Sequence, residues 1–233
     1  MQQISLLTAI ILTLFGCSAE DAGPATQATA PASPAPVAQV DPTGRHLLYL
    51  HPRIVEDQGL PASSPEHGDF QYDAILDHFR QEGFTVWSEQ RPRGADVEVH
   101  AQRSFAEIRR LLAAGVKPQN ITVLGASKGA YIASLVSHMA RNPSLNYVLL
   151  AGCSTDTVAH MRSNNIDLYG NVLAIRDASD TRLAGSCTEV FAFSSGIRQS
   201  KEIVLSVGSG HGIIFAPLED WTRPTREWAS RQN

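Results

Sequence analysis

The stretch ITVLGASKGAYIASLV, residues 121–136, runs from an apolar segment through a turn of small residues into a helical pattern. Residues 121–126 are mostly aliphatic or β-branched, a composition that favours a buried strand. After the turn, apolar residues recur every three or four positions, so a helix is predicted over residues 129–142. The turn Gly-Ala-Ser-Lys-Gly therefore places Ser127 at a junction from strand to helix.

Short apolar runs and amphipathic segments alternate along the rest of the folded part of the chain. The runs are bounded by turn formers, as buried parallel strands are. Strands that alternate with helices predict an α/β fold, with a single doubly wound, mostly parallel six-stranded sheet and helices on both faces. The predicted strands are 45–51, 84–90, 121–126, 146–152, 171–177 and 202–208, and the predicted helices are 69–83, 104–116, 129–142 and 217–232.

Capping residues mark the ends of these helices. Ser104 is suited to begin the second helix, because a serine side chain accepts a hydrogen bond from the first turn. Gly83 and Gly115 follow their helices, where glycine is the common terminating residue. In the last segment, Trp221 and Trp228 are available to pack on the sheet.

In a parallel sheet, catalytic groups gather at the carboxyl ends of the strands. Ser127, in the pattern Gly-x-Ser-x-Gly, is placed as a nucleophile on a strained turn, although small residues also fit such a turn for packing alone. His211 follows the last predicted strand in a glycine-rich turn and is the candidate base, with a surface or capping histidine as the alternative. Asp180 is the preferred acid, and Asp177 and Asp156 are the alternatives. Each of the three can instead form an Asx turn or a helix cap.

The chain order Ser127, Asp180, His211 resembles that of the α/β-hydrolase superfamily. The segment VLAIRDASD, which ends at Asp180, looks like that family's acid-bearing strand and turn, and GSGHGIIF resembles its terminal histidine loop. The resemblance covers residues 45–230. It implies that the six strands correspond to the last six of the family's usual eight, and that the first of them lies between the second and the third.

By this resemblance the protein is a serine hydrolase that cleaves an ester, amide or related acyl bond through an acyl-enzyme, with no metal and no cofactor. The family's oxyanion hole uses the N–H after the nucleophile, here that of Lys128, and a second N–H from the loop after the first strand of this set. Many members carry His-Gly there, whereas this chain has His51, Pro52 and Arg53. Proline has no N–H, so Arg53 is the expected second donor.

Charged side chains cluster in the loop HPRIVEDQG that follows the first predicted strand. His51, Glu56 and Asp57 are tentative substrate-binding residues at this end of the sheet. The alternative is that Arg53, Glu56 and Asp57 pair with one another at the surface, where such ion pairs contribute little.

Lys128 fills the variable position between the serine and the second glycine of the motif. Its ammonium either favours an anionic substrate or points away to pair with Glu89 or Asp156. The substrate is expected to be a small molecule or a surface-presented acyl group, because no insertion between the strands is long enough for a lid. Two other functions stay open: a non-catalytic binding or scaffolding protein on the same fold, and a peptidase or thioesterase with the same three residues.

The chain begins MQQISLLTAIILTLFGC, whose apolar stretch is short for a membrane span and typical of a signal peptide. LFGC resembles the lipobox of bacterial lipoproteins, so residues 1–17 are predicted to be a signal peptide that leaves Cys17 lipidated. Ordinary cleavage or an uncleaved anchor are the alternatives. Residues 18–42, rich in Ala and Pro, predict a disordered linker before a domain over residues 43–233. The resemblance to lipoproteins implies the bacterial cell envelope, at the outer membrane facing the periplasm, with lipid as the sole membrane contact.

The remaining cysteines and the charge balance narrow the function further. Cys153 and Cys187 form an even pair in an exported chain, which predicts a disulfide, with two buried thiols as the alternative. The net charge is −4, and beyond residue 42 the chain carries 19 basic and 20 acidic residues. A surface with so little excess positive charge gives no support to nucleic-acid binding.

Overall fold

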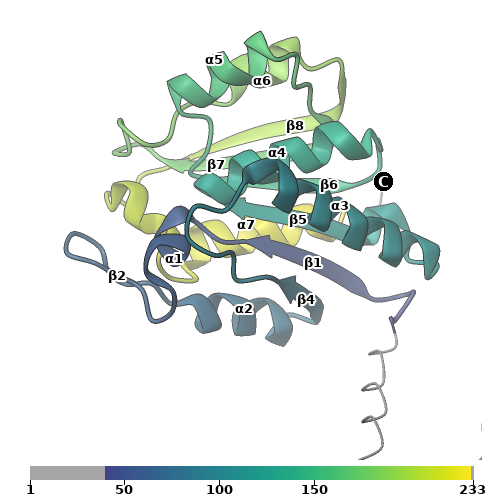
Figure 1. The fold of residues 1–233 in the computed structure, drawn as a ribbon, viewed down its shortest axis with the longest axis horizontal. Helices are drawn as coiled ribbons and strands as arrows, with labels where there is room; N and C mark the ends of the chain where they lie inside the picture. The colour runs from purple at the N-terminus through teal and green to yellow at the C-terminus, as the bar shows by residue number, and fades with distance from the viewer. Residues whose placement is uncertain (1–39, 232–233) are drawn as a thin grey trace, which may run out of the picture. The chain divides into compact units, whose positions relative to one another are not determined.

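The computed structural model of the protein describes residues 40–231. The predictions for the signal peptide 1–17, for lipidation at Cys17 and for nearly all of the linker 18–42 lie outside the described residues. A six-stranded, all-parallel sheet forms the centre of the domain, in the order β4-β1-β5-β6-β7-β8 (Figure 1). The strands are β1 (Arg45–Leu50), β4 (Phe84–Ser88), β5 (Ile121–Ala126), β6 (Asn146–Leu150), β7 (Tyr169–Asp177) and β8 (Gly196–Leu205).

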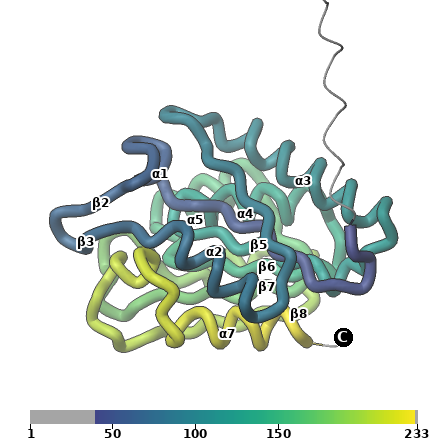
Figure 2. The backbone as a smooth tube through the Cα atoms, turned by 90° about the horizontal axis from the view of Figure 1, so that it is seen from below, coloured from purple at the N-terminus to yellow at the C-terminus, as the bar shows by residue number. Residues whose placement is uncertain are grey.

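Helices cover both faces of this sheet, as the sequence predicted (Figure 2). Successive side chains of a strand point to opposite faces, so each central strand contributes to two separate cores. In β1, for example, Leu48 and Leu50 belong to one core, and Leu47 and Tyr49 belong to the other. The first core lies under α3 (Val97–Ala113), α4 (Lys128–Ala140), α5 (Thr155–Ser163) and α6 (Thr188–Phe193), and the second lies under α1 (Arg53–Gln58), α2 (Tyr72–Gln81) and α7 (Glu219–Ala229).

The strand order creates the crevice in which a ligand is expected. β1 lies between β4 and β5, which confirms the predicted place of the first strand. The chain leaves β1 toward α1 on one face of the sheet and leaves β5 toward α4 on the opposite face. Connections that diverge in this way open a crevice at the carboxyl ends of the two strands. The residues after β1 and β5 therefore face each other across the place where a substrate binds in such folds.

Most helices lie where the periodicity predicted them, but α3 begins earlier than expected. Its N-cap is Asp96, whose side chain accepts hydrogen bonds from Glu98 N (2.8 Å) and Val99 N (3.0 Å). Ser104, the predicted cap, lies inside the helix and donates from Oγ to the His100 carbonyl at 2.9 Å. An aspartate that satisfies two N–H groups of the first turn is the stronger cap, so the prediction for Ser104 is wrong.

Other features agree with the sequence or add to it. Gly83 and Gly115 follow α2 and α3 with positive φ, and Trp221 and Trp228 are buried under the sheet, as predicted. The short helices α1, α5 and α6 were not predicted, nor were the 3-10 helices η1 (Pro118–Asn120) and η2 (Gly210–Ile214). A hairpin of β2 (Ser63–Ser64) and β3 (Gly68–Asp69) was also missed. None of the described helices is long and apolar enough to cross a bilayer.

A disulfide joins Cys153, in the loop after β6, to Cys187, at the start of α6. It confirms the predicted pairing and closes a segment with a sequence separation of 34 residues. Loop closure of that length stabilises a fold by about 3–4 kcal/mol on the chain-entropy model. The bridge ties the turn that follows β7 to the neighbouring loop after β6.

Candidate active site

Ser127 stands on a sharp turn between β5 and α4. Its backbone has φ 53° and ψ −116°, a left-handed conformation that a non-glycine residue adopts only under strain. A Cβ atom on Gly125 would collide with the Gly129 carbonyl, and one on Gly129 would collide with the Leu50 carbonyl. Both glycines of the motif are therefore required for the strand and helix to approach. The strained turn holds the Ser127 side chain at the carboxyl end of β5.

His211 lies between Ser127 and Asp180, the other two predicted catalytic residues. Its Nε2 is 2.9 Å from Ser127 Oγ, and its Nδ1 is 2.5 Å from Asp180 Oδ2. The second oxygen of Asp180 accepts hydrogen bonds from Leu183 N (3.0 Å) and Ala184 N (3.2 Å), which hold the carboxylate in place. An ionised carboxylate only accepts, so Nδ1 carries the proton and Nε2 is free to accept one from the serine.

Neither of the two alternative acids takes the place of Asp180 beside His211. Asp177 accepts hydrogen bonds from Ser179 N (2.9 Å), Val207 N (2.9 Å) and Gly208 N (3.1 Å). Burial acts to raise the pKa of Asp177, but a hydrogen bond from Ser179 Oγ, together with these backbone hydrogen bonds, outweighs it and lowers the pKa below its ordinary value. The N–H groups of residues 207 and 208 donate to Asp177, and β8 ends at Leu205, not at residue 208 as predicted. The strand also begins at Gly196, before the predicted residue 202, because its first half is polar and exposed and lacks the apolar run on which the prediction relied. Asp156 lies in the first turn of α5.

The two expected oxyanion donors lie on opposite sides of the crevice. Lys128 and Arg53 are the first residues of α4 and α1, and the first N–H groups of a helix have no partner within it. Neither N–H donates to an acceptor in the part of the chain that the structure describes. The close approach of Gly129 to the Leu50 carbonyl brings the start of α4 directly against the end of β1.

His51 fixes the peptide group that carries the Arg53 N–H. The backbone N–H of Arg91 donates to His51 Nε2 at 2.8 Å, so the proton of the neutral ring is on Nδ1, which donates to the Pro52 carbonyl at 2.9 Å. Burial and the neighbouring Arg91 lower the pKa of His51 to about 4, so the ring is neutral at pH 7. The Pro52 carbonyl and the Arg53 N–H share one planar peptide group, and holding the carbonyl therefore orients the N–H.

Glu56 is buried and binds two cations. Its Oε1 accepts from Arg91 Nε at 2.7 Å, and its Oε2 lies 2.5 Å from Lys128 Nζ. Lys128 Nζ also donates to the Ala95 carbonyl at 2.9 Å. The predicted pairing of Lys128 with Glu89 or Asp156 is therefore wrong, because the helix start turns its ammonium toward α1.

The structure separates the three tentative substrate-binding residues. His51 and Glu56 are buried and bonded to Arg91, as described above. Asp57 lies at the surface and pairs with Arg53 at 3.2 Å, which is the surface pairing given as an alternative for these two residues. Arg91 was missed by sequence reasoning, although its place just after the strand β4 is the kind of position that the search for site residues used.

Comparison with known proteins addresses the fold. No protein-family model matches the sequence, and a search of the curated proteins finds no match. A solved structure from Klebsiella pneumoniae subsp. pneumoniae, described as a dienelactone hydrolase, is similar with a TM-score of 0.52 and 14% identity over 84% of this chain and 90% of that one. Est1E from Butyrivibrio proteoclasticus, solved with ferulic acid, gives a TM-score of 0.52 and 10% identity over 81% of this chain and 88% of its own.

These similarities span most of both chains. They agree with the six-stranded parallel sheet and with the turn that places Ser127 between a strand and a helix. The chain has the α/β-hydrolase fold. At identities this low the likeness speaks for the fold alone. In this sheet β4 is an edge strand, because the first two of the family's usual eight strands have no counterpart among residues 40–231.

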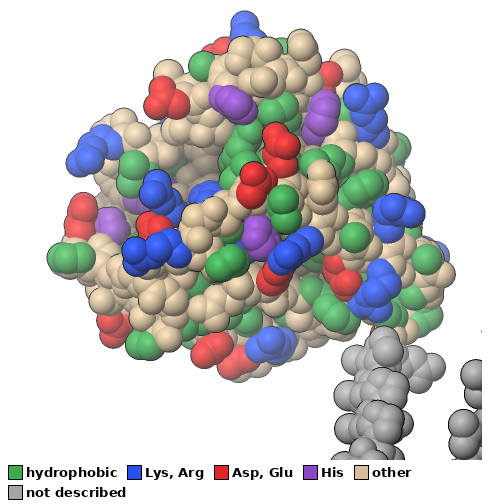
Figure 3. All heavy atoms as spheres, in the orientation of Figure 1, with side chains coloured by type: hydrophobic (Ala, Val, Ile, Leu, Met, Phe, Trp, Pro, Cys, Tyr) green, Lys and Arg blue, Asp and Glu red, His purple; other side chains and the backbone are tan. Residues whose placement is uncertain are grey.

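A small cavity of about 160 Å³ opens beside Ser127 in this α/β-hydrolase fold. Its wall is formed by residues of α4 and α5, by the disulfide-bonded Cys153 and by the exposed Leu183. The molecule is hollowed on the same side as the carboxyl ends of the strands, and basic, acidic and histidine side chains lie near the hollow (Figure 3). The lining residues are Ser127, Lys128, Tyr131, Ala151, Gly152, Cys153, Ser154, Thr157 and Leu183.

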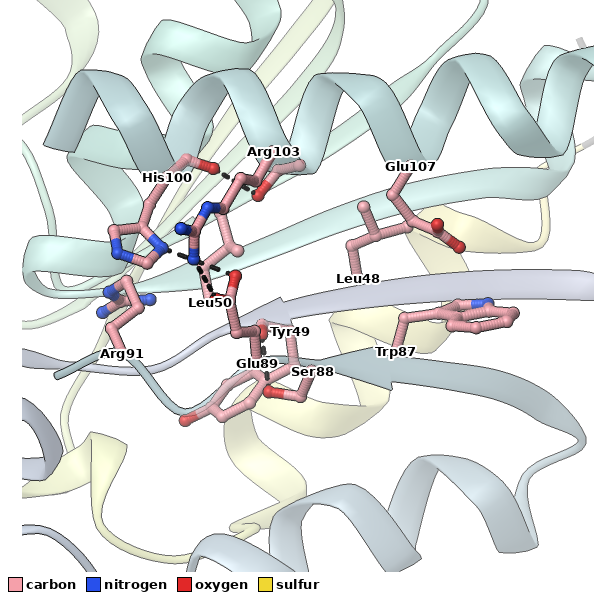
Figure 4. Close-up of a pocket in the computed structure, with 11 residues that line it drawn as sticks. Leu48, Tyr49, Leu50, Trp87, Ser88, Glu89, Arg91, His100, Arg103 and Glu107 are labelled. Atoms are coloured by element: carbon pink, nitrogen blue, oxygen red, sulfur yellow. Dashed lines mark hydrogen bonds and ion pairs between the residues drawn. The ribbon is translucent and has the colours of Figure 1, made fainter. Parts of the chain in front are cut away.

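A second cavity, of about 250 Å³, lies between α3 and the edge of the sheet (Figure 4). Three of its side chains lie close together: Glu89 lies 2.6 Å from Arg103 and 3.4 Å from His100. Ser127 does not line this cavity, whereas Arg91 does. Arg91 therefore belongs both to the wall of this cavity and to the network of His51 and Glu56. Among the described residues, no three His, Cys, Asp or Glu side chains converge as metal ligands.

Proposed function

We propose that the protein is a serine hydrolase that cleaves an ester or a related acyl bond through an acyl-enzyme. The observation that carries the proposal is the position of His211, which bridges Ser127 Oγ at 2.9 Å and Asp180 Oδ2 at 2.5 Å. When a histidine lies between an acid and a serine in this way, the acid orients one ring nitrogen and the other is free to act as a base.

The reaction follows from this arrangement. His211 Nε2 takes the proton of Ser127 Oγ while the oxygen attacks the acyl carbon, and Asp180 stabilises the imidazolium that results. The imidazolium then protonates the leaving group as the acyl bond breaks. Water then gives a proton to His211 as its oxygen attacks the acyl carbon of the acyl-enzyme. The bond from the acyl carbon to Ser127 Oγ breaks, the acid is released, and the imidazolium returns the proton to Ser127 Oγ. The N–H groups of Lys128 and Arg53 are the proposed donors to the oxyanion in both halves of the reaction.

The size of the cavity beside Ser127 limits the substrate. A space of about 160 Å³ with serine, threonine and tyrosine side chains in its wall suits a short acyl or alcohol group better than a long alkyl chain. We expect p-nitrophenyl acetate and butyrate to be hydrolysed with a higher kcat/KM than p-nitrophenyl decanoate. The Ser127→Ala variant, folded by circular dichroism, serves as the control and should be inactive on all three. Equal activity of wild type and Ser127→Ala would refute the proposal.

We further propose that the protein is lipidated at Cys17 and held at the periplasmic side of the outer membrane. The Cys153–Cys187 disulfide supports export, because disulfides persist in oxidising compartments. In a Gram-negative host, the wild-type chain should sediment with membranes and Cys17→Ser should not. Membrane retention of Cys17→Ser at the wild-type level would overturn this proposal.

A further inference from the structure

The side chain of Lys128 connects the nucleophile turn to the opposite wall of the crevice. Its backbone N–H is one proposed oxyanion donor, while its ammonium leaves α4 and reaches Glu56 on α1 at 2.5 Å. The Lys128 side chain is 22% exposed and that of Glu56 is 1% exposed. An ion pair that is partly withdrawn from water is screened less and is stronger than one at the surface.

The connection continues from Glu56 to the second proposed donor. Arg91 Nε binds Glu56 Oε1 at 2.7 Å, and Arg91 Nη2 donates to the His51 carbonyl. His51 in turn holds the Pro52 carbonyl and so orients the N–H of Arg53. One unbroken series of contacts therefore runs from the residue that carries the first N–H to the peptide group that carries the second.

We propose that the Lys128 ammonium is a positioning group that, through Glu56 and Arg91, holds the two oxyanion donors at a fixed separation. This inference rests on the proposed serine hydrolase function. It also gives a structural reason for the lysine at the variable position of the Gly-x-Ser-x-Gly motif, because the ammonium binds Glu56 on the opposite wall of the crevice.

The need for such a link follows from the elements that it joins. α1 has six residues, and a helix of that length has too few internal hydrogen bonds to be stable alone. Its place relative to α4 therefore depends on contacts with the rest of the fold, and the Lys128–Glu56 ion pair joins the two helices directly. A loss of about 1 Å in the placement of a catalytic group lowers a rate by roughly 100-fold, so a small movement of α1 is enough to matter.

The test compares Lys128→Met with wild type in the full-length protein. The methionine keeps the backbone N–H and removes the ammonium. With p-nitrophenyl acetate, and per active site titrated with a fluorophosphonate, we expect kcat to fall by roughly 10- to 100-fold while KM changes by less than about 3-fold. The inhibition constant of a trifluoromethyl ketone, which forms a tetrahedral oxyanion on a serine, should rise by the same factor as kcat falls. Lys128→Arg, which keeps a cation within reach of Glu56, should recover most of the loss.

Glu82→Gln is the matched control, because Glu82 also pairs with an arginine in a half-buried site, Arg226 at 2.6 Å, but at the opposite end of the sheet. It should leave kcat and the inhibition constant unchanged. If Lys128→Met fails to fold, Lys128→Gln carries the same expectation.

Three outcomes overturn the inference. One is a kcat of Lys128→Met within about 2-fold of wild type. Another is an equal loss of kcat in Lys128→Arg and Lys128→Met. The third is the absence of fluorophosphonate labelling in wild type, which would overturn the proposed function as well. Labelling of wild type together with an unchanged kcat in Lys128→Met would refute only the positioning role.

Discussion

Gly129 lies so close to Leu50 that a Cβ atom on the glycine would overlap the leucine carbonyl oxygen. This contact between the first turn of α4 and the end of β1 brings the proposed nucleophile next to the loop that carries the Arg53 N–H. It depends on one residue having no side chain, and it can be tested by adding a single methyl group.

Gly129→Ala is therefore expected to push α4 away from β1. We predict a fall in the free energy of unfolding of about 1–3 kcal/mol, the usual cost of overpacking, measured by urea denaturation. Esterase kcat should also fall by more than about 10-fold, because both oxyanion donors move apart. Gly94→Ala is the control: nothing lies within 4 Å of the added atom, although its φ of +71° brings some strain. That variant should keep the wild-type kcat, and a wild-type kcat in Gly129→Ala would contradict the account.

Asp180→Asn should abolish most of the activity and leave the fold intact. An asparagine at this position no longer stabilises the imidazolium of His211 and permits the wrong tautomer of the ring. A loss in kcat on the order of 10³- to 10⁴-fold is expected from the equivalent change in a serine-histidine-aspartate site. Steady-state kinetics with p-nitrophenyl acetate give the value. A loss below 10-fold would mean that another acid orients His211.

Asp177→Asn should behave in the opposite way, with reduced stability and nearly normal kcat. The carboxylate of Asp177 ties the ends of β7 and β8 together, and its pKa is lowered in the folded protein. A carboxyl group with a lowered pKa contributes stability above its ordinary pKa of 3.8, and this contribution is lost as the pH falls through the folded value. The difference in unfolding free energy between wild type and Asp177→Asn should thus be largest near pH 7 and shrink below about pH 4. A difference that does not depend on pH would refute this role.

His51 gives rise to a second dependence of the free energy of unfolding on pH. The direction of this dependence follows from the His51 ring, which stays neutral in the folded protein. Its pKa falls from 6.5 to about 4 on folding, so the unfolded chain binds more protons between these values. The free energy of unfolding should therefore decrease as the pH is lowered from 6.5 to 4.

In His51→Gln this dependence of the free energy of unfolding on pH should disappear. The control is His160→Gln, which changes an exposed histidine and should leave the dependence in place. Urea denaturation across this pH range measures both. His51→Gln should also lower kcat more than it changes KM, because the Arg53 N–H loses its orientation.

Much of the architecture could be predicted from local patterns in the sequence. Buried parallel strands are nearly continuous apolar runs, and for that reason β1, β4, β5, β6 and β7 were located to within two residues at each end. The first half of the edge strand β8 is polar and exposed, so it shows no such run and was missed. Ser127, Asp180 and His211 could be selected because each has a chemically suitable side chain just beyond a predicted strand. The short helices α1, α5 and α6 contain too few turns to show a periodic pattern.

The contacts of Glu56 with Arg91 and Lys128 were beyond local reasoning. These residues are 35 and 72 positions from Glu56, and they meet only because β1 lies between β4 and β5. The sequence suggested Glu89 or Asp156 as the partner of Lys128, and the structure pairs it with Glu56. The direction in which an α4 side chain leaves the helix selects the partner, and that direction depends on the strained turn at Ser127.

The central claim is that Ser127 is a nucleophile activated by His211, and covalent labelling tests it most directly. Full-length wild type, Ser127→Ala and His211→Ala are treated with a fluorophosphonate probe, and the modified peptide is identified by mass spectrometry. The account predicts labelling of wild type at Ser127, and none in either variant at matched fold and concentration. Absence of labelling in folded wild type, or labelling that persists in Ser127→Ala, would contradict it.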